Sequence, residues 1–375
     1  MKFDINGKDL AQCLSTLIKA IPSKTPWPLL ECFYFVAEDG DMYVTASDAE
    51  TQVRLPVSVY NCTSDCSFAV DAKMLVKPLN ELKNELLTFD VNEQTFEIKV
   101  HYGNGEFSLF GLDAKLYPTI KIEDSKESFN VNFNAGLIKR VLSKSINQVS
   151  YDTLRPVMCG IYVNVDNNYA EFVSTNAMKL LVLKEEINYN NAGPFSFILS
   201  KRTATLLHQL IQNSDDSLNI GFFIEGNYSM IRSKDFTVKC RLIEGKYPNY
   251  NSVIPTTFAS ELTVNKSLLA NAVKRVSVFS NPASMLTVLD IHNNNIKVNS
   301  RDIDFATSAE EDVPCQFNGS EMMIGFKSNY LLQLLSVIDD TEVVICLNDA
   351  SRAALLKPKE KDKDKMKMIL MPMML

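Results

Sequence analysis

The sequence predicts an α+β protein made of three repeated modules, each with two helices packed on antiparallel strands. Two observations lead to this fold. Short stretches of alternating apolar and polar residues, typical of strands, each precede an amphipathic helical stretch. The same landmarks then recur in the same order at intervals of 125 to 133 residues along the 375-residue chain. We expect the modules at residues 1–123, 124–256 and 257–375, because a repeat of this length indicates whole domains rather than a solenoid.

The first landmark is a strand that leads directly into a helix. The strand segments begin at Lys2, Ser128 and Glu261. At 100° per residue, the apolar side chains of each following segment fall on one side and the basic side chains on the other. Helices are therefore expected over residues 8–20, 135–147 and 265–279.

The second landmark is a later strand that ends in a helix with a lysine in its first turn. These helices are expected to begin near residues 72, 200 and 327 and to end near residues 83, 212 and 338. Pro78 lies inside the first of them, where it removes a backbone hydrogen bond. We therefore expect that helix either to kink at Pro78 or to begin later.

Two further landmarks complete the repeat. An alternating strand recurs at residues 43–48, 171–176 and 296–301. A Tyr-Pro pair closes the first two modules at residues 117–118 and 247–248. In the first module, the glycines of the segment 102–106 predict a hairpin turn between two strands.

The composition excludes several classes of protein. Apolar residues make up 46% and charged residues 22%, and no apolar run is long enough to span a bilayer. The N-terminus is typical of a strand, not a signal peptide, so we expect a cytoplasmic protein with no membrane partner. Its eight scattered cysteines should then stay reduced. For the one close pair, Cys62 and Cys66, a loop or strand is favoured over a metal site because no further ligand lies nearby.

The sequence carries no catalytic motif. Its histidines are His101, His208 and His292, and none lies four residues from another, which excludes the helical zinc motif. His208 is expected on a helix face. Nucleophile elbows, phosphate-binding loops and dinucleotide-binding turns are absent from the sequence. We expect a protein without catalytic residues, metal or cofactor; a hydrolase using two carboxylates brought together by folding is left open.

The charge distribution indicates a polyanionic partner. The net charge of −7 argues against a simple basic DNA-coating protein. The six expected helices are covered by windows at residues 7–20, 72–84, 135–148, 200–213, 265–279 and 327–338. These helix windows hold 14 basic residues against two acidic ones, Asp9 and Glu81, a net charge of +12 that leaves −19 for the rest of the chain. Lysines on solvated faces are the plain alternative, but such faces usually mix both signs. We interpret the bias as contact with the phosphates of double-stranded DNA, without sequence specificity. The candidate contacts on the helices are Lys73, Lys77, Lys139, Arg140, Lys144, Lys201, Arg202, Lys266, Lys274 and Arg275.

The chain resembles the bacterial sliding clamps, the β subunits of DNA polymerase III. The resemblance covers its whole length. It rests on six motifs: Met1-Lys2-Phe3, Pro28-Leu29-Leu30, Arg155-Pro156-Val157-Met158-Cys159-Gly160, Glu244-Gly245-Lys246-Tyr247-Pro248-Asn249-Tyr250, Ile324-Gly325-Phe326-Lys327-Ser328-Asn329-Tyr330 and Met371-Pro372-Met373-Met374-Leu375.

The resemblance implies a non-catalytic processivity factor. Such a protein is a head-to-tail homodimer whose six domains form a ring of DNA-clamp domains with twelve inner helices. A clamp loader opens the ring around DNA, and the ring tethers the polymerase III alpha subunit, other polymerases and repair proteins. The match places Phe107 and Leu109 at one end of the subunit interface and Val278 and Phe279 at the other. It also places Lys24 near the DNA.

The resemblance further implies a cleft between the second and third modules that binds linear peptides. Its residues would be Met158, Thr175, Ala177, Met178, Lys179, Leu180, Pro248, Ser252, Val253, Tyr330, Ser351, Ile369, Met371, Pro372, Met373, Met374 and Leu375. Apolar and methionine side chains suit an adaptable groove. Taken alone, the methionine-rich tail is more often a core strand.

The chain departs from the family at several points. The family commonly has Gly-His-Arg-Leu at residues 177–180 and Arg at Met374, so this cleft should favour more apolar peptides. The charged segment 357–367 is interpreted as a solvated loop in preference to a second DNA contact. The alternative function left open is a three-module scaffold that binds nucleic acid without encircling it.

Overall fold

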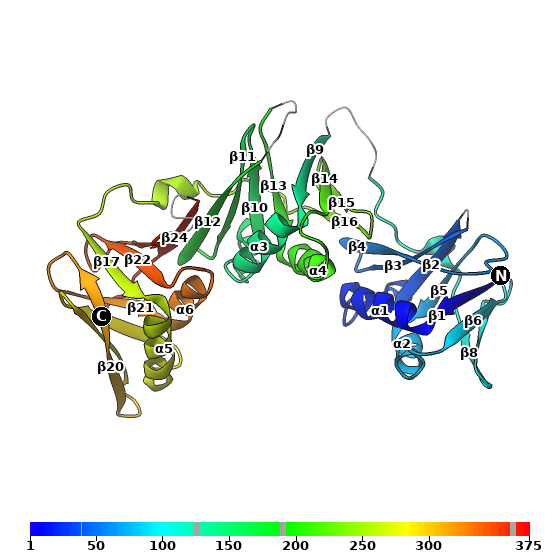
Figure 1. Cartoon of the computed structure of the whole chain (residues 1–375), viewed down its shortest axis with the longest axis horizontal. Helices are drawn as coiled ribbons and strands as arrows, with labels where there is room; N and C mark the ends of the chain where they lie inside the picture. The colour runs from blue at the N-terminus through cyan, green and yellow to red at the C-terminus, as the bar shows by residue number, and fades with distance from the viewer. Residues whose placement is uncertain (39, 123–127, 188, 190–192, 361–364) are drawn as a thin grey trace. The chain divides into compact units, whose positions relative to one another are not determined.

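The computed structural model describes residues 1–38, 40–122, 128–187, 189, 193–360 and 365–375 (Figure 1). Within these ranges the chain repeats one unit, a strand, a helix and three strands, six times. Each of the three modules predicted from the sequence therefore contains this unit twice. The expected boundary at residues 123–124 lies outside the described ranges. The charged segment 357–367 was interpreted as a solvated loop, but residues 357–358 and 366–367 are the ends of two paired strands; residues 361–364 between them lie outside the described ranges.

The first three units run from the N-terminus into the central module. The first comprises β1 (Lys2–Asn6), α1 (Gly7–Leu17), β2 (Cys32–Glu38), β3 (Asp41–Ser47) and β4 (Thr51–Val57). The second comprises β5 (Cys66–Asp71), α2 (Ala72–Glu81), β6 (Leu86–Val91), β7 (Glu97–Tyr102) and β8 (Gly105–Phe110). The third comprises β9 (Phe129–Asn134), α3 (Ala135–Ser145), β10 (Gly160–Val165), β11 (Tyr169–Thr175) and β12 (Lys179–Glu186).

The last three units complete the chain. The fourth comprises β13 (Phe195–Ser200), α4 (Lys201–Ile211), β14 (Asn219–Glu225), β15 (Tyr228–Arg232) and β16 (Thr237–Arg241). The fifth comprises β17 (Ser260–Asn265), α5 (Lys266–Val276), β18 (Leu286–Ile291), β19 (Asn295–Asp302) and β20 (Thr307–Phe317). The sixth comprises β21 (Met322–Lys327), α6 (Ser328–Ser336), β22 (Glu342–Leu347), β23 (Ala354–Pro358) and β24 (Met366–Leu370).

The chain divides into two compact parts, residues 1–139 with 202–242 and residues 140–201 with 243–375. The division cuts the central module because strands pair across the module boundaries. In the first part β4 pairs with β16, which gives the eight-stranded sheet β5-β2-β3-β4-β16-β15-β14-β9 beside the four-stranded sheet β1-β6-β7-β8. In the second part β12 pairs with β24 within a twelve-stranded sheet.

Side-chain caps and close packing define the helices of the first part. The Asn6 side chain accepts a hydrogen bond from the Lys8 amide at the start of α1, and Asp71 does the same for Met74 at the start of α2. The two helices pack together, and a Cβ at Gly7 would lie 2.2 Å from the Leu82 carbonyl oxygen. The helix α2 begins at Ala72 and includes Pro78, so the later start considered above is wrong.

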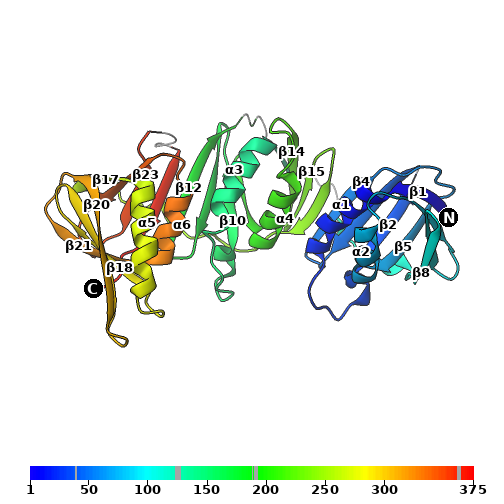
Figure 2. The same ribbon diagram turned by 60° about the horizontal axis from the view of Figure 1, so that its bottom comes forward.

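A single apolar cluster in the second part joins strands of the central and third modules. Its members include Val173 and Leu180 of β11 and β12, Val344 of β22 and Ile369 of β24. Helices α5 and α6 lie side by side against the strands of the third module (Figure 2). Because this core is continuous, it holds the loops of both modules in a defined relation.

The helix predictions agree closely with the structure. Each helix begins within one residue of the predicted start, and α1 and α5 each end in a 3-10 turn, at Ile18–Ala20 and Ser277–Phe279. His208 lies on α4, and the predicted hairpin pairs Tyr102 with Gly105. Cys66 opens strand β5, and Cys62 precedes it in a loop. None of the helices in the described ranges is long and apolar enough to cross a bilayer.

Candidate functional site

The loop between β11 and β12 is held by its own side chains. The Thr175 hydroxyl donates to the Lys179 carbonyl oxygen at 2.7 Å. The Asn176 side-chain oxygen accepts from the amides of Met178 at 3.1 Å and Lys179 at 2.9 Å. These bonds hold Ala177 at a φ of +71°, a region that favours glycine. The loop therefore presents Ala177 and Met178 to solvent.

The C-terminal tail crosses from this loop to strand β21. Strand β24 pairs with β12, with Ile369 opposite Leu180, and both side chains are buried. Beyond the strand, the Met371 amide donates to the Met178 carbonyl oxygen at 2.9 Å, and the Met373 amide donates to the Gly325 carbonyl oxygen at 2.8 Å. The methionine-rich end is thus a core strand only as far as Leu370.

The tail leaves apolar side chains exposed beside the loop. Met374 is 96% and Leu375 63% exposed, and Met178 and Met371 are partly exposed. Gly325 leaves room beneath the tail: a Cβ there would lie 2.9 Å from a Leu375 methyl carbon, and that side chain would have to shift. Met178, Met371, Met374 and Leu375, with Pro372 and Met373 between them, are called the tail surface below.

Buried behind the tail surface is the ammonium group of Lys179. It donates hydrogen bonds of 2.6 Å to the Asn147 carbonyl oxygen and to the side-chain oxygens of Gln148 and Gln333. Among the described residues no carboxylate pairs with it. Burial, with a smaller effect of the positive charge on Lys201, lowers the pKa of Lys179 to about 7. The ring of Tyr330 on α6 lies 5.6 Å from the ammonium nitrogen.

The remaining peptide-site candidates lie on loops of the same compact part. Met158 is half-buried in the 3-10 turn Pro156–Cys159, and Ser351 donates to Asp349. Pro248, Ser252 and Val253 are exposed, the last two in the turn Tyr250–Val253. That these residues and the tail surface line one groove stays a prediction.

Sequence analysis missed the acceptors of Lys179. Gln148 and Gln333 are 31 and 154 residues away in sequence and belong to no motif. The available signal was a lysine directly before the apolar run 180–183, because an amine buried with such a run needs hydrogen-bond acceptors.

Five basic candidates are paired with carboxylates from outside the helix windows. On helix α3, Lys139 pairs with Asp216 at 2.8 Å. Arg140 pairs with Glu185 and Lys144 with Asp339, both at 2.6 Å. Arg202 pairs with Asp48, and Arg275 pairs with Glu311 through two bonds. The acidic residues that the helices lack are therefore supplied by neighbouring loops and strands.

The basic candidates differ in how far they reach solvent. Lys144 was placed on the polar side of its helix, but it is buried, and its ammonium pairs with the Asp339 carboxylate beyond α6. Lys266 donates to the Ile338 carbonyl oxygen at 2.7 Å, and the ammonium of Lys201 lies 3.7 Å from the centre of the Tyr151 ring. The candidates Lys24, Lys73, Lys77 and Lys274 are exposed.

The interface candidates lie beside two edge strands. Phe107 and Leu109 are half-buried on β8, which pairs with β7 alone among the described strands. Val278 is 77% exposed and, with Phe279, forms the 3-10 turn that packs against β20. Residues 307–314 of β20 pair with β19, which leaves their other edge open among the described residues.

Known protein families match the chain in the order of its three modules. Models of the DNA polymerase III beta subunit match three segments: the N-terminal domain over residues 1–121, the central domain over 132–249 and the C-terminal domain over 251–374. The chain is 23% identical to the beta sliding clamp of Staphylococcus epidermidis over 96% of both chains, and 22% identical to that of Bacillus subtilis over 95% and 96%. A Pseudomonas aeruginosa sliding clamp structure superposes with a TM-score of 0.93 at 22% identity, covering all of both chains. A Bacillus subtilis clamp structure gives 0.92 at 21% identity, with coverage of 100% and 99%.

Proposed function

Because the chain belongs to the DNA polymerase III beta subunit family, we propose that it encloses double-stranded DNA as a homodimer and tethers a polymerase to it. In this role it catalyses no reaction. A closed ring stays on DNA by topology and needs only weak attraction to phosphates, which is compatible with a net charge of −7.

The strand pairing carries this proposal. In each described module junction, the last strand of one unit pairs with the last strand of a unit in the next module: β4 with β16 and β12 with β24. By the same pattern, β20 and β8 are the strands left without such a partner among the described strands. A second copy supplies both, with β20 of one protomer meeting β8 of the other. This contact is heterologous and can close by rotation, as a head-to-tail dimer requires.

Apolar side chains flank both of these edges. Phe107 and Leu109 belong to β8 itself, and Val278 and Phe279 pack beside β20. Their burial between protomers would add a hydrophobic contribution to the strand pairing. The expected particle has a mass of about 84 kDa, twice the 42.2 kDa of the chain.

DNA contact in this proposal falls mainly to the exposed lysines of the helices and of the loop that holds Lys24. Lys73, Lys77 and Lys274 lack ion-pair partners among the described residues, so their charges are available to phosphates. Contacts of this kind carry no sequence information and let a protein move along the duplex. The paired residues, such as Arg275, would contribute less because a carboxylate already compensates them.

Partner proteins are proposed to bind the tail surface through short apolar peptides. Methionine side chains adapt to differently shaped ligands, and here four apolar residues stand exposed on a fixed backbone. Polymerase III alpha, the clamp loader, other polymerases and repair proteins are the expected partners. The absence of an arginine at Met374 favours peptides without an acidic residue at the matching position.

Retention on circular DNA tests the central claim. The protein is loaded on nicked circular DNA with the clamp loader of the same organism and ATP, and is then passed through a sizing column. We expect co-elution with the circle and release after a single cut that linearises it. Equal retention on both forms would instead support the three-module scaffold that binds DNA without encircling it.

A further inference from the structure

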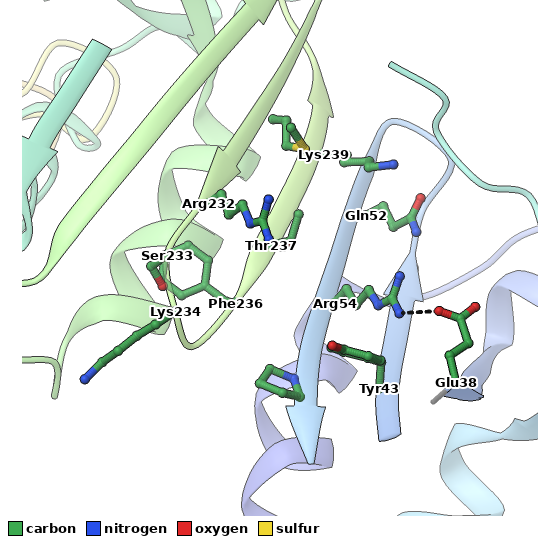
Figure 3. A pocket seen from close by; sticks show the side chains of 12 residues that line it. Glu38, Tyr43, Gln52, Arg54, Arg232, Ser233, Lys234, Phe236, Thr237 and Lys239 are labelled. Carbon is green, nitrogen blue, oxygen red and sulfur yellow. Dashed lines mark hydrogen bonds and ion pairs between the residues drawn. The ribbon is translucent and has the colours of Figure 1, made fainter. Parts of the chain in front are cut away.

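A basic hollow lies where the sheets of the first and central modules join. It has a volume of about 400 Å³ and is lined by β3, β4, β15 and β16, by Glu38 at the end of β2, and by the turn after β15 (Figure 3). The lining of the hollow includes no residue of the six helices or of the tail surface. Its charge is unexpected, because the residues outside the helix windows sum to −19.

Four cations line this hollow: Arg54, Arg232 and Lys239 come from three strands, and Lys234 lies in the turn after β15. In the pairing of β4 with β16, Arg54 stands opposite Thr237 and Gln52 opposite Lys239, and β15 adds Arg232 opposite Thr237. Alternation along a strand places these side chains on one face, while the intervening Val53 and Val238 are buried on the other. The register of the junction therefore collects Arg54, Arg232 and Lys239 around one space.

Their charge is poorly compensated. The one carboxylate in the lining is Glu38, which is 62% exposed and 3.4 Å from the Arg54 guanidinium. An exposed pair at this distance contributes little. Burial and the positive charge on Arg54 both lower the pKa of Lys239. The cations thus repel one another in the absence of a further anion.

Arg54 is also held in position, and it keeps a hydrogen-bond donor without an acceptor among the described residues. Its guanidinium stacks on the Tyr43 ring, 3.9 Å from the ring centre, which fixes its plane. Its Nε atom is buried and has no acceptor among the described residues. The hydroxyl groups of Ser233 and Thr237 line the same hollow and can donate to an anion.

We propose that this hollow binds phosphate groups, with Arg54, Arg232 and Lys239 as their cationic partners. A guanidinium presents paired donors that fit phosphate oxygens, and three converging cations match a multiply charged anion better than a single carboxylate. The volume is that of a nucleotide-sized ligand. The phosphates come either from a free nucleoside polyphosphate or from the backbone of single-stranded nucleic acid, which share this chemistry.

Calorimetric titration of the full chain tests the proposal with three probes: pyrophosphate, a ten-residue oligothymidylate and hexaglutamate, at 150 mM salt. We expect saturable binding of at least one phosphate probe. The variant Arg54→Gln/Arg232→Gln should weaken it at least tenfold, and Arg232→Gln alone, at an exposed site, should weaken it severalfold. The control Lys99→Gln/Lys297→Gln removes two strand lysines elsewhere, with side chains 48% and 40% exposed, and should leave the affinity unchanged.

The probes also identify the source of the phosphates. Tighter binding of pyrophosphate indicates a free polyphosphate, and tighter binding of the oligonucleotide, displaced by pyrophosphate, indicates a strand. The proposal is overturned if neither phosphate probe binds, if hexaglutamate binds more tightly than both, or if Arg232→Gln, with an unchanged circular dichroism spectrum, keeps wild-type affinity. None of these outcomes alters the result of the circular-DNA experiment.

Discussion

The ammonium nitrogen of Lys179 lies 2.6 Å from the side-chain oxygen of Gln333, and this bond ties a loop of the central module to helix α6 of the third. Two more oxygens, on Asn147 and Gln148, complete three acceptors for the three ammonium protons. The same lysine forms the base of the loop that carries Met178. The backbone bond from Met371 to Met178 then connects this buried cation to the tail surface.

Stability should depend on pH through Lys179. Its folded pKa is about 7 and its unfolded value 10.5, so between these pH values the unfolded chain binds more protons than the folded chain. The free energy of unfolding should therefore rise with pH across this window, by at most about 1.4 kcal/mol per pH unit, and show no dependence on this group below it.

Urea denaturation of wild type and Lys179→Met at pH 7, 8 and 9 isolates this contribution, because other groups cancel in the difference. The free energy of unfolding of the wild type, minus that of the variant, should increase as the pH rises. Lys297→Met, at a strand position whose side chain is 40% exposed, serves as the control for the loss of a lysine. A flat or falling difference for Lys179→Met would contradict the assignment.

Replacing Ala177 with glycine should stabilise the protein. A left-handed backbone costs a non-glycine residue about 1–2 kcal/mol, and the greater freedom of glycine in the unfolded chain offsets about 0.4–1 kcal/mol of that gain. We expect an increase of about 0.5–1 kcal/mol in the free energy of unfolding. The matched substitution Ala283→Gly, at an exposed residue without a positive φ, should be neutral or destabilising. Equal effects of the two changes in thermal denaturation would rule out strain at Ala177.

The tail surface should be required for partner binding and dispensable for the dimer. Deleting residues 371–375 removes the exposed apolar side chains and the bonds to Met178 and Gly325, but leaves β24 paired. Binding of a fluorescent polymerase-derived peptide should be lost, while light scattering still reports about 84 kDa, twice the chain mass.

A point variant distinguishes the contribution of a side chain to peptide binding from that of the tail backbone. Met374→Ala should weaken the peptide severalfold, whereas Met323→Ala, a 48% exposed methionine on β21 outside the predicted site, should not. Similar losses for both variants would place the peptide elsewhere.

Charge reversal should show whether the exposed helix lysines contact DNA. Lys73→Glu/Lys274→Glu places two negative charges where phosphates are expected and should shorten the DNA synthesised per binding event and lower the salt dependence of DNA retention. The control Lys297→Glu reverses a strand lysine already 3.6 Å from Glu310. Wild-type processivity in the double variant would show that these two helix lysines do not contribute to DNA contact.

Interface formation should depend on Val278. It is 77% exposed in the single chain, so Val278→Asp should leave the fold intact and shift the mass from about 84 to about 42 kDa in dilute solution. The equally drastic change Leu154→Asp, at a residue 89% exposed, should leave the dimer unchanged. A dimeric Val278→Asp protein would place the interface elsewhere.

Local sequence patterns determined the helices and their repeat. Helix periodicity and the lysine after each strand depend on residues within about two turns, so the starts of α2 and α4 were predicted to within one residue. The smaller unit that repeats six times was not predicted, because its two copies within a module agree in the order of strands and helices more than in residue identity. Tertiary structure decided what could not be local: Lys144 and Asp339 are 195 residues apart, and their pairing turned an apparent surface charge into a buried one. The junction of β4 with β16 likewise collected Arg54, Arg232 and Lys239, because strand register, which no single segment encodes, sets which side chains share a face.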